Sequence, residues 1–124
     1  MGDRKATGAW LGMSLPKLDL AILRHYCEQR VPPDAIDQVR VELEVSRGAV
    51  TIVERRPPWR ADYRPEWTRL GIARFRYANT TGLWTLYWRD RNQSWHIYDL
   101  VEPATHIGPL LDEVDGDPTG IFWG

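Results

Sequence analysis

Residues 39–45, VRVELEV, alternate strictly between aliphatic and charged side chains, a pattern with a period of two that a helix does not produce. On a β-strand this alternation places four aliphatic side chains on one face and Arg40, Glu42 and Glu44 on the other. A sheet that contains this strand therefore has one apolar face that must be covered and one polar face that meets solvent.

A hairpin turn follows this strand. Arg47-Gly48 is a two-residue turn of the kind that joins antiparallel strands, and it leads into a second strand at residues 49–56, AVTIVERR. The short turn also predicts the register, with Val45 opposite Val50 and Leu43 opposite Ile52.

Three more strands are predicted at residues 72–78, 83–90 and 94–100, joined by turns at residues 79–82, NTTG, and at Arg91-Asn92. Each turn again predicts a register. The expected cross-strand pairs are Phe75 with Leu86, Leu86 with Ile97, and Trp88 with Trp95.

Helices are predicted at both ends of the chain. The first begins near Ser14 and runs to about Arg30, where VPP at residues 31–33 ends it. Thr105 is expected to cap a short second helix, and the apolar C-terminal IFWG is expected to dock into the core. The predicted fold class is α+β: a five-stranded antiparallel β-meander with an N-terminal helix and a short C-terminal helix packed on one face.

The first helix carries two apolar stripes. One contains Leu18 and Ile22, and the other contains Leu23 and Cys27, so the helix is expected to contact two surfaces, of which the second is a terminal segment or another subunit. One predicted partner is therefore a second copy of this chain, bound through this helix to form a homodimer.

Residues 14–124 are predicted to form a single domain after a loose tail at residues 1–13, in which Met13 is an alternative start.

Composition excludes some classes of protein. No apolar run approaches the roughly 20 residues that a membrane helix needs, and the first residues contain no apolar signal segment. A single cysteine, Cys27, excludes an internal disulfide framework and a multi-cysteine zinc site. We therefore predict a cytoplasmic protein that has no membrane contact, no metal and no cofactor.

Charge is distributed unevenly along the chain. Residues 39–76 hold nine arginines against five acidic residues, whereas residues 77–124 hold two arginines against seven acidic residues. Arginine suits phosphates and carboxylates better than lysine does, which favours an anionic partner. A genome rich in G and C also replaces lysine by arginine throughout a protein, and this explanation stays open.

The most arginine-rich stretch is ERRPPWRADYRPEWTRL, residues 54–70. Its prolines exclude a regular strand or helix across residues 57–65, which leaves a long connector between the second and third strands. Trp59 and Trp67 are expected to plug the open end of the core. The arginines are either solvated or line the mouth of a binding cleft, and those predicted to bind are Arg55, Arg56, Arg60 and Arg64 together with Trp59.

The polar face of the sheet is the other candidate surface. The predicted registers place Arg74, Tyr87 and His96 in one row, and Arg76, Thr85 and Tyr98 in the next. Arginines and aromatic rings in neighbouring rows are typical of a binding platform for an anionic ligand, nucleic acid or an acidic protein surface. The alternative is a solvated face held by cross-strand pairs.

The sequence resembles the bacterial family known as domain of unknown function 3024. The matching segments are residues 18–33, 50–60, 83–99 and 117–123, so the resemblance covers nearly everything after residue 14. The resemblance implies no activity, because the family's function is not known.

Catalytic motifs are few. The chain contains no glycine-rich phosphate loop, no serine nucleophile elbow and no HExxH. Glu54 and Asp99 alternate onto the apolar face of their strands, where burial would raise the pKa of a carboxyl group, and His96 is the third catalytic candidate. Three functions therefore stay open: a small binding module, a hydrolytic enzyme, and an oligomerising subunit without a ligand.

Overall fold

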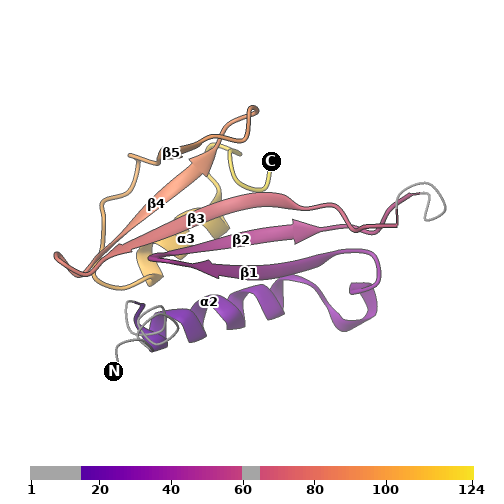
Figure 1. Ribbon diagram of the computed structural model, residues 1–124, viewed down its shortest axis with the longest axis horizontal. Helices are drawn as coiled ribbons and strands as arrows, with labels where there is room; N and C mark the ends of the chain where they lie inside the picture. Colours follow the sequence, from indigo (N-terminus) through magenta and orange to yellow (C-terminus); the bar gives the residue numbers. More distant parts are fainter. Residues whose placement is uncertain (1–14, 60–64) are drawn as a thin grey trace, which may run out of the picture.

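The computed structural model describes residues 15–59 and 65–124. Five antiparallel strands form one sheet in the order β1-β2-β3-β4-β5, so every strand lies beside its neighbours in sequence (Figure 1). The strands are β1 Arg40–Ser46, β2 Ala49–Arg55, β3 Leu70–Ala78, β4 Leu83–Arg89 and β5 Trp95–Ile97.

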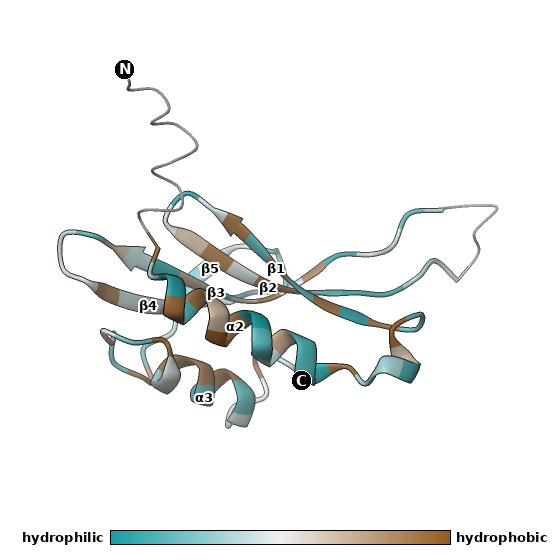
Figure 2. Ribbon diagram, turned by 90° about the horizontal axis from the view of Figure 1, so that it is seen from below, coloured by the Kyte–Doolittle hydropathy of each residue, from teal (hydrophilic) through white to brown (hydrophobic). Residues whose placement is uncertain are grey.

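The two α-helices of the described residues lie on one side of this sheet (Figure 2). They are α2 Lys17–Arg30 and α3 Gly108–Gly116, and a 3-10 turn, η1 Pro33–Ala35, connects α2 to β1. The predicted α+β meander with two helices on one face is therefore confirmed. The other side of the sheet, which the two helices leave uncovered, is called the outer face below.

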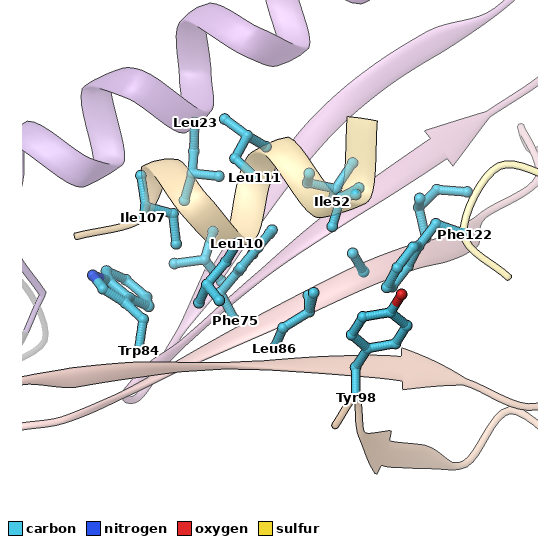
Figure 3. Close-up of a cluster of buried hydrophobic side chains, with 14 of the residues drawn as sticks. Leu23, Ile52, Phe75, Trp84, Leu86, Tyr98, Ile107, Leu110, Leu111 and Phe122 are labelled. Atoms are coloured by element: carbon cyan, nitrogen blue, oxygen red, sulfur yellow. The ribbon is translucent and has the colours of Figure 1, made fainter. Parts of the chain in front are cut away.

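The core fills the space between the sheet and the helices (Figure 3). Phe75 and Trp84 are fully buried at its centre, and Leu23 of α2 and Leu110 of α3 pack against the same cluster. Phe122 is 6% exposed, so the apolar C-terminus docks into the core as predicted. The pattern of apolar strand faces thus produces one continuous core.

Two of the predicted registers are confirmed and one is wrong. Val45 pairs with Val50, and Phe75 pairs with Leu86, as the turns indicated. Trp88, however, pairs with His96 and not with Trp95. The β4–β5 turn has three residues instead of two, because Asp90 N–H bonds to the Ser94 carbonyl and Gln93 adopts φ 68°.

This shift of one residue moves every side chain of β5 to the opposite face of the sheet. Trp95 now pairs with Arg89 and lies on the outer face. Tyr98 moves the other way: it is 4% exposed, packs on Phe122 and donates a hydrogen bond from its hydroxyl to Glu113 at 2.7 Å. Burial, together with that carboxylate, raises the pKa of Tyr98 to about 12.

The helix ends also differ from the predictions. Helix α2 begins at Lys17 rather than at Ser14, which lies outside the described residues. Helix α3 is capped at Ile107 without a side-chain hydrogen bond, so Thr105 does not cap it. The backbone N–H of Ile107 instead points to the buried carboxylate of Asp19 in α2, at 3.3 Å. A contact between the two helices thus replaces the predicted local cap.

The two stripes of α2 have different environments. Leu23 and Cys27 are buried, and burial raises the pKa of the Cys27 thiol to about 12, which keeps it unreactive. Leu18 is 70% exposed and Ile22 is 38% exposed, so these two residues of the first stripe are open to solvent. The predicted tail at residues 1–13 lies outside the described residues.

Candidate functional site

The outer face carries charged and aromatic side chains that face away from the helices. Its β1 side is a network of ion pairs. The guanidinium of Arg55 contacts Glu42 at 2.8 Å and Glu44 at 3.0 Å, and Arg69 binds both carboxylate oxygens of Glu44. The hydrogen bonds from Arg69 hold the pKa of Glu44 below its usual range. These four side chains therefore neutralise one another.

Arg74 lies further along the face, on β3, and its environment is different. Its Nε donates a hydrogen bond to the Thr51 hydroxyl at 3.0 Å, and its guanidinium carbon lies 4.6 Å from the centre of the Trp95 ring. Burial lowers the pKa of Arg74, and the charges of Arg76 and Arg69 lower it further. Arg74 thus contacts neutral groups directly, and the charge of Glu44 partly offsets the effect of the two cations on its pKa.

Arg76 is the nearest neighbour of Arg74 along β3 on the same face. It is exposed, and its guanidinium carbon lies 5.8 Å from the centre of the Tyr87 ring. Within residues 15–59 and 65–124, no carboxylate lies within ion-pair distance of Arg74 or Arg76. The two guanidinium groups can therefore accept an anion without breaking an ion pair.

The position of Trp95 depends on Gly71. A Cβ atom at Gly71 would meet the Trp95 ring at 2.9 Å, so only glycine lets the indole lie this close to β3. Arg89 also contacts Gly71, because its Nε donates a hydrogen bond to the Gly71 carbonyl at 2.9 Å. Trp95 was not predicted to be part of this surface. The signal in the sequence that could have revealed it is Gly71 itself, because a glycine inside a strand often marks the close approach of another group.

The connector residues are dispersed. Arg56 contacts Glu54 at 3.4 Å, and its backbone bonds with Thr68 extend the β2–β3 pairing beyond the ends of both strands. Trp59 is 86% exposed, so the prediction that it plugs the core is wrong. Trp67 is half-buried under Arg40, with 4.2 Å between the guanidinium carbon and the ring centre. Arg60 and Arg64 lie outside the described residues.

The three catalytic candidates are not brought together. Glu54 lies near the end of β2 and contacts Arg56, whereas His96 lies on β5 with β3 and β4 between them, a separation of roughly 14 Å at the usual strand spacing. His96 contacts Asp90 at 2.6 Å and stacks on Trp88. Asp99 is exposed in the turn after β5.

No group of His, Cys, Asp or Glu side chains in the described part of the chain could hold a metal ion. None of the helices found there is long and apolar enough to cross a membrane.

These features define a class: a small α+β protein whose helices cover one face of an antiparallel sheet and whose other face carries arginines and aromatic rings. The chain belongs to the family described as domain of unknown function 3024 (DUF3024), whose sequence model matches residues 13–124. The resemblance noted in the sequence is thereby confirmed. Comparisons with curated proteins and with solved structures found no match.

Proposed function

We propose that this protein is a binding module that holds an anionic ligand on the outer face through Arg74 and Arg76. The observation that supports this proposal is the contrast between two pairs of arginines. Arg55 and Arg69 form ion pairs with glutamates, whereas Arg74 and Arg76 lie side by side with no carboxylate of the described residues within ion-pair distance, although the charge of Glu44 still acts on Arg74. Burial is the main reason that the pKa of Arg74 is lowered, and an anion between the two groups would offset this burial as well as the repulsion from Arg76.

The aromatic rings favour nucleic acid over a simple anion. Arg74 lies over one face of the Trp95 ring and Arg76 over one face of the Tyr87 ring, and aromatic rings among arginines are typical of surfaces that stack on nucleobases and contact phosphates. Single-stranded nucleic acid is therefore the ligand that we propose. An acidic protein surface would use the arginines but not the ring faces. We keep the predicted bacterial origin and cytoplasmic location as part of this proposal, since nucleic acid is available there.

The test is a titration of a labelled single-stranded oligonucleotide at about 20 mM salt, where surface charges are weakly screened. The variant Arg74→Gln/Arg76→Gln is expected to bind at least about tenfold more weakly, because each lost hydrogen bond to a charged group is worth more than 1 kcal/mol. The slope of log affinity against log salt should fall by about 1.4, which corresponds to two lost phosphate contacts. Arg24→Gln, an exposed arginine on α2, is the control and should bind like the parent.

A second variant changes the affinity in the opposite direction. Glu44→Gln removes the charge that neutralises Arg69 and Arg55, so the oligonucleotide should bind a few-fold more tightly. The proposed function is refuted if the parent protein does not bind the oligonucleotide at about 20 mM salt and neither variant differs from it in binding.

The exposed stripe of α2 supports a second candidate, a homodimer. Leu18 and Ile22 are exposed on a helix that is packed on its other side, and solvent-exposed leucine and isoleucine on one face favour an interface. Sedimentation equilibrium should then give twice the mass of the chain, and Leu18→Gln/Ile22→Gln should give the single-chain mass. A monomeric parent protein across the micromolar range would exclude this candidate.

A further inference from the structure

A hollow opens on the outer face beside β4, where the segment after β5 leaves the edge of this strand for a few residues. Tyr98 donates its backbone N–H to the Leu86 carbonyl, and Ala104 exchanges two hydrogen bonds with Trp84. Between these two points, residues 99–103 leave the edge of β4. Thr85, the residue between Trp84 and Leu86, therefore lines the hollow from the strand side.

The walls of the hollow combine acceptors with apolar surfaces. Its volume is about 230 Å³, and its other lining residues include the acidic residues Asp99 and Glu102 and the apolar residues Ile97, Val101 and Pro103. Sites that hold a whole small molecule usually enclose roughly 300–1,000 Å³. This hollow is smaller, so it suits one part of a ligand whose remainder lies outside it.

Arg76 of the proposed site lies beside this hollow, and Arg74 lies further along the same face. Arg76 pairs with Thr85 across the β3–β4 ladder, and Tyr87 pairs with Ile97 across the β4–β5 ladder. Side chains paired in this way lie about 5 Å apart at Cβ on the same face. One cation, Arg76, thus lies next to a hollow that two acidic residues line.

We propose that the hollow binds a nucleobase that carries an exocyclic amino group, while the attached phosphate contacts Arg76 and Arg74. A flat ring fits between aliphatic side chains, and an amino group supplies the N–H donors that Asp99 and Glu102 require. Carboxylates recognise the amino group of cytosine in this way, whereas uracil presents a carbonyl oxygen at the same position and is repelled. The inference rests on the proposed function and adds its base preference.

The experiment compares two RNA homopolymers of about ten nucleotides, one of cytidine and one of uridine, which carry the same charge. The parent protein should bind the cytidine strand about tenfold more tightly. In Asp99→Asn/Glu102→Gln the preference should fall to near equality while the uridine strand binds as well as before or better, because two repulsive charges are gone. Asp34→Asn/Asp37→Asn, which removes one exposed carboxylate in η1 and another just after it, is the matched control and should keep the preference.

The outcomes separate the two proposals. Equal binding of both strands by the parent protein would overturn the base preference but leave the proposed function intact, whereas absence of binding to either strand would overturn both. Competition by CMP and UMP identifies the source of the ligand. Displacement by CMP alone supports recognition of a free nucleotide, and a strand preference that neither nucleotide displaces supports recognition of a strand.

Discussion

Replacing Trp84 by Ala is expected to lower the free energy of unfolding by about 3–5 kcal/mol, the range for removing a large buried aromatic side chain. The Trp84 ring is fully buried, lies 5.1 Å from the ring of Tyr77 and fills the core between β4 and the start of α3 (Figure 3). Its removal leaves a cavity that the two helices cannot close, because both are fixed at other points of the sheet.

Chemical denaturation followed by circular dichroism measures this loss. Leu100→Ala is the control, because Leu100 is 62% exposed and a surface substitution should change stability by no more than about 0.5 kcal/mol. If Trp84→Ala unfolds at the same denaturant concentration as the parent protein, the core is not centred on this ring.

The hairpins explain how much of the fold could be predicted. Gly48 adopts φ 68° and Gly82 adopts φ 70°, so the glycines identified both turns, and the registers of β1–β2 and β3–β4 followed from them. The β4–β5 turn has no glycine, and Gln93 takes the left-handed position instead of Asn92. Left-handed glutamine is uncommon, so local propensity predicted a turn that was one residue too short.

The same turn decided which site residues could be predicted. Arg74 opposite Tyr87 and Arg76 opposite Thr85 depend only on the β3–β4 register, and both pairs are present. His96 and Tyr98 depend on the β4–β5 register, so their rows were wrong. Trp95 came to the outer face for the same reason.

The spacing of the arginines in the sequence could not predict which of them form ion pairs. Arg55 alternates onto the same face as Arg74, yet one is held by two glutamates and the other by a hydroxyl and a ring. The difference arises from position in the sheet. Arg55 lies opposite β1, which supplies Glu42 and Glu44, whereas Arg74 lies one strand further from those carboxylates. Surface ion pairs of this kind are weak individually, so Glu42 and Glu44 chiefly determine which arginines stay available to a ligand.

Asp19→Ala is expected to lower the free energy of unfolding by about 2–6 kcal/mol, because it leaves two buried N–H donors without an acceptor at about 1–3 kcal/mol each. Asp19 is 3% exposed in the first turn of α2, and its carboxylate accepts hydrogen bonds from the Trp84 indole at 2.8 Å and from the backbone of Ile107 at 3.3 Å. One side chain thus joins α2, β4 and the start of α3.

A double-mutant cycle with Trp84→Phe isolates the indole contact, because phenylalanine keeps an aromatic ring but lacks the N–H group. Asp19→Ala should cost at least about 1 kcal/mol less in the Trp84→Phe background than in the parent protein, since one of the two orphaned donors is already gone. Equal costs in both backgrounds would mean that the Asp19–Trp84 hydrogen bond contributes nothing to stability. Asp19 would then act through Ile107 alone, and the link between the helices would not depend on the sheet.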